Sequence, residues 1–282
     1  MIRLTCMTLP YLKMPFERAL AGIADAGYRY VSFGLPHDGK DVPEEQNARA
    51  ADEIGALLAR YRLEPVMLVS TNQIGPGQPI ERARQRFEFA KTLGITELLS
   101  LGTLSYRNFP HDPLPEDELK RKNDAFVGKF RELAGLAEEF GIYVTIKPHT
   151  GNTATAKELL ETLGEIGSSY VRASYDPGNV HFYEGIDPAA DFPLIVRHTH
   201  SLVAKDHRGA RAERDFPIPG EGDVDFGSIF RTLKAESFDG SVVVERIDGT
   251  DVTISPEETD RRIAQARNNM VRLLEQAGCN YE

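Results

Sequence analysis

The sequence alternates eight times between a short apolar run rich in β-branched residues and a longer amphipathic segment. The predicted strands cover residues 2–9, 30–35, 64–70, 97–102, 142–148, 171–176, 200–206 and 241–247. The predicted helices cover residues 16–27, 44–61, 79–94, 116–141, 155–166, 187–198, 226–236 and 256–278. These segments carry apolar residues at helical spacing with charges opposite. Eight strand–helix units predict a parallel sheet that closes into a (β/α)8 TIM barrel.

The same pattern sets the domain organisation. No shift in composition divides the chain, so we expect a single TIM-barrel domain over residues 1–282. An open doubly wound sheet is the alternative, and it is disfavoured because no GxGxxG follows the first strand. Two connections are longer than a turn requires, residues 102–117 and 207–225. Both follow strands, so both should lie on the C-terminal face of the barrel, where barrel enzymes hold their active sites.

Charge and composition exclude several classes of protein. The chain has 33 basic and 43 acidic residues, a net charge of −10 that repels phosphate backbones and argues against a nucleic-acid partner. No apolar run is long enough to cross a membrane, and the N-terminus lacks the apolar stretch of a signal peptide. The two cysteines, Cys6 and Cys279, form no metal-binding or disulfide spacing. We therefore expect a cytoplasmic protein without a membrane partner.

Charged and polar residues cluster where the predicted strands end. The fifth strand ends with Lys147 and His149, the sixth with Asp176, Asn179 and His181, the seventh with Lys205, Asp206, His207 and Arg208, and the eighth with Glu245 and Arg246. In a barrel all these ends meet at one face. Charges written into apolar strands are costly unless they meet partners, so the sequence predicts one polar site there.

Two kinds of site suit this set of residues. Carboxylates and histidines around one pocket suit a divalent cation such as Mn²⁺, Mg²⁺ or Zn²⁺, which would polarise a substrate carbonyl. In the alternative, the lysines neutralise the carboxylates directly and no metal is needed. Asp176 has a simpler interpretation as well, because an aspartate before Pro-Gly often only accepts hydrogen bonds from a turn.

The order of motifs resembles the sugar isomerase/epimerase superfamily with a xylose isomerase-like TIM barrel. The resemblance covers nearly the whole chain and depends most on its second half, where a strand-five "PH" is followed by "YDPGN", "KDHRG", "PGEGDVDF" and "VVVER". It implies a barrel enzyme acting on carbohydrates. It also implies a divalent metal held by a glutamate, an aspartate, a histidine and a glutamate from strands five to eight.

The chain keeps only part of that ligand set. Asp176 and Glu245 match the strand-six and strand-eight ligands, whereas Lys147 replaces the strand-five glutamate and Val203 stands where the strand-seven histidine is expected. His149 and His200 are the candidate replacement ligands. However, His200 lies five residues before Lys205 on the same strand, so it should face the other way unless a bulge re-aims it.

Residue roles follow from these positions. Lys147, Glu245, His149 and Lys205 are the expected catalytic groups, acting as electrophile, base or acid. The metal ligands expected from the resemblance are Asp176 and Glu245, with His149 or His200. The expected substrate-binding residues are Asn179, His181, Asp206, Arg208 and Arg246. His181 has the simpler alternative of lining the pocket wall, and Arg208 that of a solvated loop residue.

The resemblance implies an isomerase or epimerase that abstracts a proton next to the carbonyl of a small keto sugar or sugar acid. A lyase or decarboxylase of a 3-oxo sugar acid that uses Lys147 is one alternative, and a non-catalytic sugar-binding barrel is another. A nuclease like endonuclease IV is disfavoured by Lys147, Val203 and the negative charge. We expect a small carbohydrate substrate and a homodimer or homotetramer.

Overall fold

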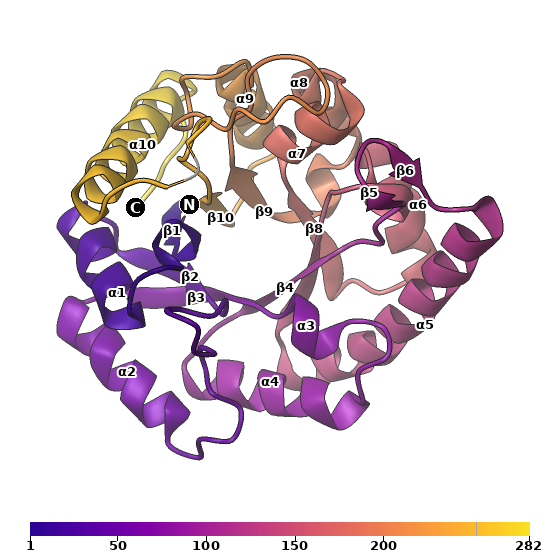
Figure 1. The fold of residues 1–282 in the computed structure, drawn as a ribbon, viewed down its shortest axis with the longest axis horizontal. Helices are drawn as coiled ribbons and strands as arrows, with labels where there is room; N and C mark the ends of the chain where they lie inside the picture. Colours follow the sequence, from indigo (N-terminus) through magenta and orange to yellow (C-terminus); the bar gives the residue numbers. More distant parts are fainter. Residues whose placement is uncertain (252) are drawn as a thin grey trace.

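The computed structural model describes residues 1–251 and 253–282. Eight parallel strands close into a barrel in the order β1-β10-β9-β8-β7-β4-β3-β2, and the helices surround it (Figure 1). The barrel strands are β1 (Arg3–Met7), β2 (Tyr30–Phe33), β3 (Glu64–Val69), β4 (Glu97–Leu101), β7 (Tyr143–Lys147), β8 (Val171–Tyr175), β9 (Thr199–Ala204) and β10 (Ser241–Val244). This architecture confirms the predicted xylose isomerase-like TIM barrel.

Helices connect the strands as the amphipathic pattern predicts. The α-helices are α1 (Phe16–Asp25), α2 (Ala50–Tyr61), α3 (Thr71–Ile74), α4 (Ile80–Thr92), α5 (Glu116–Phe140), α6 (Ala156–Ile166), α7 (Pro177–Glu184), α8 (Pro188–Asp191), α9 (Phe226–Ala235) and α10 (Pro256–Gln276). The 3₁₀-helices are η1 (Leu9–Tyr11), η2 (Gly151–Thr153), η3 (Phe192–Leu194) and η4 (Val196–His198).

Several segments differ from the prediction, among them the helix expected over 44–61, which begins only at Ala50, and α3, which was not predicted. The segment 102–117, expected to be a loop, contains a short antiparallel hairpin of β5 (Tyr106–Asn108) and β6 (Asp112–Pro113). The expected helix over 187–198 is divided into α8, η3 and η4, because Pro193 interrupts the helical backbone ladder. Helix α7 follows β8 directly and was not predicted. Asp176 before Pro177 is nevertheless a helix start, with an N-cap aspartate and a proline at the first helical position.

Alternation along the strands divides the barrel into an outer and an inner core. On β7, Val144 and Ile146 join the large apolar cluster between strands and helices, whereas Thr145 and Lys147 point into the barrel. A second cluster of buried side chains fills the inside at mid-height: Met7, Tyr30, Val66, Met67, Val69, Leu99 and Val243. The barrel interior is thus a packed core, and a site can form only at its ends.

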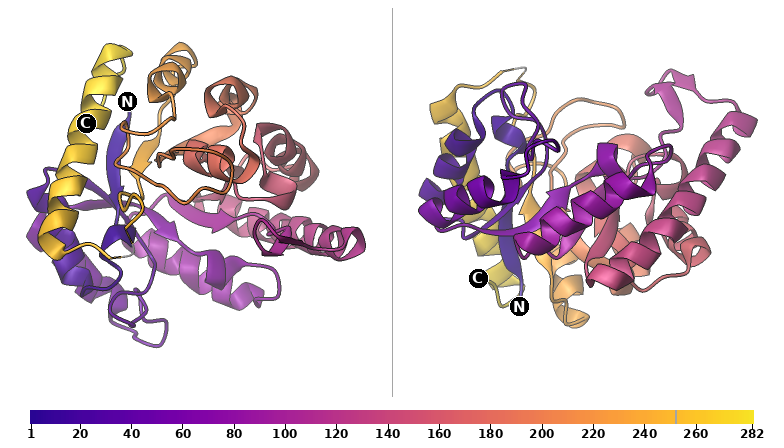
Figure 2. Two further views of the ribbon diagram at one scale, coloured as in Figure 1. Left: turned by 45° about the horizontal axis from the view of Figure 1, so that its top comes forward. Right: turned by 90° about the horizontal axis from the view of Figure 1, so that it is seen from below.

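The two ends of the barrel differ in how they are covered. The chain termini lie side by side at the N-terminal end of β1, where Ile2 bridges to Tyr281, and the loop after β9 arches over the opposite end (Figure 2). Over the described ranges, none of the helices is both long enough and apolar enough to cross a lipid bilayer.

Candidate active site

Four neighbouring strands deliver one charged side chain each to the C-terminal end of the barrel. Lys147 is the last residue of β7, and Asp176, Lys205 and Glu245 directly follow β8, β9 and β10. All four side chains are buried, with at most 6% of their surface exposed. The structure therefore brings together residues that lie 98 positions apart in the sequence, as expected for the ends of parallel barrel strands.

These four side chains form a closed ring of alternating charge, which we call the lysine–carboxylate ring. Lys147 Nζ contacts Glu245 Oε1 and lies 3.5 Å from Asp176 Oδ2. Lys205 Nζ lies 4.0 Å from Asp176 Oδ2 and 3.9 Å from Glu245 Oε2. Each carboxylate thus has both ammonium groups within 4.0 Å. The ring carries two positive and two negative charges, so its burial does not leave an uncompensated ion.

The two carboxylates of the ring have different tendencies to ionise. Burial raises the pKa of Glu245, but the Lys147 and Lys205 ammonium groups outweigh burial and bring that pKa to about 2. For Asp176 burial dominates, so its pKa is raised in spite of the same two lysines. Glu245 is therefore the fixed negative charge of the ring, and Asp176 is the carboxylate that takes up a proton more readily.

The two lysines differ in the same way. Burial lowers the pKa of Lys147, but Glu245 and Asp176 outweigh it, so the net shift is upward. Burial also lowers the pKa of Lys205, and here the carboxylates do not compensate, so the net shift is downward. The contacts explain the difference, because the direct hydrogen-bond acceptor of Lys205 Nζ is the neutral amide oxygen of Asn179. Lys147 thus holds its proton more tightly than Lys205 does.

Asp176 performs two tasks with its two oxygens. Oδ1 accepts a 2.9 Å hydrogen bond from the backbone N–H of Asn179 and caps α7. Oδ2 is buried and has no hydrogen-bond partner at normal distance within residues 1–251 and 253–282, and it faces Lys147 and Lys205. Oδ1 thus makes the contact that the turn interpretation expects, and Oδ2 lies with the charged side chains at the strand ends, where its functional role stays a prediction.

Asn179 and His149 lie next to the lysine–carboxylate ring and contact each other. The Asn179 amide donates to the Pro148 carbonyl (2.7 Å) and lies 3.3 Å from His149 Nδ1. This arrangement makes Nδ1 an acceptor. Burial, followed by the charges of Lys147 and Lys205, lowers the pKa of His149 to about 3. His149 is consequently a neutral imidazole at physiological pH.

An aromatic wall beside the ring was missed in the sequence. Tyr183 lies at the end of α7. The centroid of its aromatic ring is 5.3 Å from that of His149 and 4.9 Å from that of Phe109, which lies on the β5–β6 hairpin. Arg211 contacts both residues of this aromatic wall. Its guanidinium lies 5.0 Å from the centroid of the Phe109 ring, and its Nε donates a hydrogen bond to the Tyr183 carbonyl (2.6 Å). Tyr183 lies four residues after Asn179 on one helix, and this spacing would have revealed it had α7 been predicted.

Three residues expected to bind substrate instead hold the loop after β9. The Asp206 carboxylate accepts hydrogen bonds from four backbone N–H groups, those of His207, Gly220, Gly222 and Val224. Arg208 pairs with Asp215 and donates to the Glu221 carbonyl. These contacts use the polar atoms that a substrate would need, so the structure corrects the expectation for Asp206 and Arg208.

His181 also points into this loop. Its Nδ1 lies 2.8 Å from His207 Nδ1, and His207 Nε2 lies 2.6 Å from the Glu213 carbonyl oxygen. Because a carbonyl can only accept, His207 Nε2 carries a proton and its Nδ1 accepts from His181. The pocket-wall interpretation of His181 thus agrees with the contacts better than substrate binding does.

Arg246 remains at the edge of the site. It forms a bidentate ion pair with Asp248 and lies 4.2 Å from the Phe216 ring, which also lies 4.8 Å from Lys205 Nζ. Arg246 borders a pocket of about 210 Å³ between the segments that follow β1 and β10. None of the four residues of the lysine–carboxylate ring lines this pocket.

His200 lies away from the ring. It stacks on Tyr143 with a centroid distance of 4.1 Å, and its Nε2 lies 4.0 Å from Glu97 Oε2. Tyr143 and Glu97 begin their strands, so His200 belongs to the N-terminal end of the barrel. The pairing of β8 with β9 is irregular at His200, but this irregularity does not turn the side chain toward Lys205. His200 therefore lies apart from the other candidate ligands, Asp176, Glu245 and His149.

The remaining residues do not fit a divalent metal. Within residues 1–251 and 253–282, no three His, Cys, Asp or Glu side chains converge as metal ligands would. Lys147 and Lys205 lie between the two carboxylates, and protonated amines offer no lone pair to a metal while repelling its charge. The expected ligand set of Asp176, Glu245 and His149 with a metal therefore conflicts with the donors that the ring provides.

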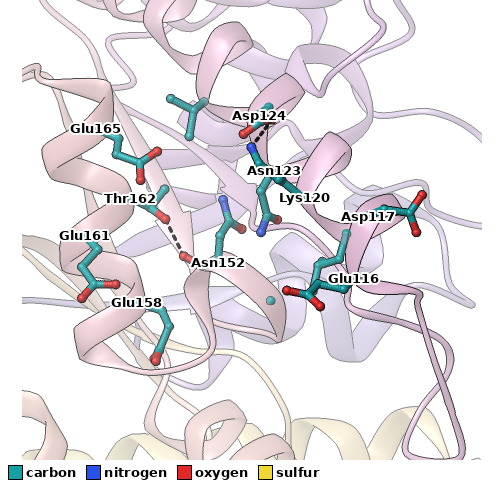
Figure 3. Close-up of a pocket in the computed structure, with 13 residues that line it drawn as sticks. Glu116, Asp117, Lys120, Asn123, Asp124, Asn152, Glu158, Glu161, Thr162 and Glu165 are labelled. Atoms are coloured by element: carbon teal, nitrogen blue, oxygen red, sulfur yellow. Dashed lines mark hydrogen bonds and ion pairs between the residues drawn. The ribbon is translucent and has the colours of Figure 1, made fainter.

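A separate groove lies outside the barrel between α5 and α6. It has a volume of about 910 Å³, and Figure 3 shows carboxylates from both helices facing it. No residue of the lysine–carboxylate ring lines it. Glu158, Glu161 and Glu165 are the acidic positions of an amphipathic helix, so we interpret this groove as a solvated helix face.

Comparison with known proteins finds relatives that match part of the chain. The chain is 32% identical over 140 residues to the rhizopine catabolism protein MocC of Rhizobium meliloti, covering 43% of this chain and 42% of that protein. It is 26% identical over 142 residues to the inosose dehydratase of Bacillus velezensis, covering 43% and 46%. These matches span less than half the length of either relative.

Solved structures extend the likeness to the whole fold. D-psicose 3-epimerase from Clostridium cellulolyticum superimposes with a TM-score of 0.75 at 14% identity, covering 97% of this chain and 99% of that one. At this level of identity the likeness shows the fold alone. The family model described as xylose isomerase-like TIM barrel matches residues 20–276, and the chain belongs to that family.

Proposed function

We propose that the protein is an enzyme of carbohydrate metabolism that moves a proton at the carbon next to the carbonyl of a small polyhydroxylated ketone. The lysine–carboxylate ring at the C-terminal end of the barrel is the observation that carries this proposal. The ring combines a fixed cation with a buried amine that is more easily deprotonated. Pairs of groups with pKa values shifted in opposite directions are typical of acid–base catalysis.

Lys205 acts as the base in this proposal. Its neutral amine takes the proton from the carbon beside the substrate carbonyl, and the electron pair moves onto the carbonyl oxygen to give an enediolate. Lys147, held protonated by Glu245, stabilises the new negative charge on that oxygen. Asn179 keeps Lys205 in place through its amide oxygen. The division of roles follows from the different partners of the two lysines.

Two products can follow from the enediolate. Return of the proton from Lys205 to carbon gives an isomer or epimer, and the charges balance without any other reactant. If the substrate carries a hydroxyl one carbon further on, that group leaves as water with the same proton, which is a dehydration. The relatives named inosose dehydratase favour this lyase outcome as a second candidate. Loss of CO₂ from a 3-oxo sugar acid would use the same electron sink.

The side chains next to the lysine–carboxylate ring suit a small polar substrate. His149 and Tyr183 lie beside the lysine–carboxylate ring, and each offers a polar atom and an aromatic face to a substrate. Arg246 offers a cation at the edge of the site. We assign these residues to substrate hydroxyls or an acidic group. A location in the cytoplasm also belongs to the proposal, because Cys6 and Cys279 are free thiols.

Turnover of a panel of ketoses, inososes and keto sugar acids in D₂O tests the proposal. Proton NMR reports exchange at the carbon beside the carbonyl, and mass spectrometry reports loss of water or CO₂. We expect Lys205→Met and Lys147→Met each to lower turnover at least 100-fold, as loss of a general base or electrophile does. Lys157→Met, on the exposed face of α6, is the matched control and should retain activity. A folded wild-type protein that exchanges no proton with any ketone supports the sugar-binding barrel instead.

A further inference from the structure

We propose that Lys147 and Lys205 together replace the divalent metal that the family resemblance implies, so that the protein needs no metal ion. This inference rests on the proposed function only where it assigns catalytic roles to the two lysines. The claim about the metal concerns binding, and it is measured without substrate.

The charges of the ring support this replacement. Asp176 and Glu245 are both buried and need two units of positive charge nearby. A divalent ion supplies both units at one point, whereas the two ammonium groups supply them at two points. Each Nζ lies within 4.0 Å of both carboxylates, so the lysines already satisfy the demand.

The donor atoms support it independently. Glu245 Oε1 is occupied by Lys147, and Asp176 Oδ1 is occupied by the backbone N–H of Asn179. A zinc site uses three or four protein donors at about 2.0–2.3 Å. The two further positions where the resemblance implies ligands carry Lys147 and the buried hydrocarbon of Val203. Asp176 Oδ2 has no hydrogen-bond partner among the described residues, but it faces both ammonium groups, so the ring offers fewer donors than the resemblance implies and places two cations beside them.

Metal binding to the full-length protein tests the inference. Wild type and Asp176→Asn are dialysed against EDTA and titrated with MnCl₂ by calorimetry, with elemental analysis of both proteins as purified. We expect the same weak binding in both, which the acidic surface explains, and well below one ion per chain as purified. About one Mn²⁺ per chain bound by wild type at micromolar concentration, and lost in Asp176→Asn, would overturn the inference.

A gain-of-site variant tests it from the other direction. Lys147→Glu combined with Lys205→Met restores a third carboxylate and removes both cations, so we expect about one Mn²⁺ per chain with at least tenfold tighter binding than wild type. The matched control makes the same charge changes on the surface, with Lys157→Glu and Lys120→Met. A folded variant that binds no more Mn²⁺ than this control contradicts the inference. If the variant does not fold, the wild-type comparison with Asp176→Asn still decides. If the proposed function is wrong, the ketone panel will show no turnover, whereas these metal-binding results will not change.

Discussion

The two ends of the same barrel bury carboxylates in opposite ways. At the C-terminal end, Asp176 and Glu245 each face two lysines. At the N-terminal end, Glu97 is equally buried but accepts hydrogen bonds from neutral hydroxyls, those of Thr145 and Ser201, both at 2.6 Å. His200 Nε2 lies 4.0 Å from the other Glu97 oxygen, and Arg3 is the positive charge that acts on this carboxylate. We call Glu97, Thr145, Ser201 and the adjoining Ser174 the floor cluster.

This difference shows two solutions to the cost of burying a charge. In the ring the ions persist because opposite charges compensate them. In the floor cluster burial raises the pKa of Glu97 to about 7, and the Ser201 and Thr145 hydroxyls offset only part of that shift. Glu97 is therefore protonated over much of the range in which Glu245 is ionised. Of these two buried clusters, the lysine–carboxylate ring is the one that keeps its carboxylate Glu245 ionised at neutral pH.

The largest effect should follow from breaking the ring. Lys147→Met leaves two buried carboxylates with one cation, so we expect a loss of about 3–5 kcal/mol in the free energy of unfolding. Urea denaturation at pH 7 measures it. Lys147→Met combined with Glu245→Gln should recover part of the loss, and Lys157→Met should stay within about 0.5 kcal/mol. A loss below about 1 kcal/mol for Lys147→Met would show that the ring is not a buried ionic unit.

The floor cluster should respond to pH in the opposite sense to an ordinary salt-bridged carboxylate. The pKa of Glu97 is about 7 in the folded protein against 4.5 for a free glutamate, so the folded state holds the proton more tightly. Its contribution to stability is complete below pH 4.5 and is lost as the pH rises through 7. The full loss is about 3 kcal/mol.

Glu97→Gln isolates this contribution. The variant keeps the shape of the side chain and has no proton to lose, so its stability relative to wild type should rise by about 3 kcal/mol between pH 4.5 and pH 8. Urea denaturation of both proteins across this range measures the difference. A constant difference across the range would mean that Glu97 is ionised in the folded protein or not buried in it.

The smallest effect should come from His200, which lies beside the floor cluster. Burial, with the charges of Arg172 and Arg3, lowers the pKa of His200 to about 4, so it is neutral and contributes no charge. His200→Asn should change turnover less than twofold, whereas His149→Asn should lower it at least tenfold. Steady-state kinetics on the same substrate compares them. Equal losses in both variants would place His200 in the catalytic site and contradict the separation of the two ends.

Much of the fold and the members of the ring were predictable from the sequence. Strand periodicity placed Lys147, Asp176, Lys205 and Glu245 at strand ends, and closure of a parallel barrel is sufficient to make these ends meet. The pairing itself was not predictable, because the choice between a metal and the lysines depends on distances of 3.5 to 4.0 Å that sequence spacing does not fix.

Other features depend on contacts that no local pattern encodes. Glu97 opens its strand and looks like an exposed first residue, and only the hydroxyls of Thr145 and Ser201 on other strands show that it is buried. The aromatic wall depends on how the 102–117 segment folds over Tyr183. Asp206 was expected to bind substrate because it follows the end of a barrel strand. Its carboxylate oxygens instead accept hydrogen bonds from backbone N–H groups of the loop after β9.

Proton exchange by metal-free enzyme tests the central claim most directly. Wild-type protein is freed of metal with EDTA, incubated in D₂O with the best ketone of the panel, and followed by proton NMR at the carbon beside the carbonyl. With the two lysines as the working cations, exchange should continue at an unchanged rate, and Lys205→Met should abolish it. Exchange that stops after EDTA treatment and returns when Mn²⁺ is added would contradict this, because the ring would then be the empty form of a metal site.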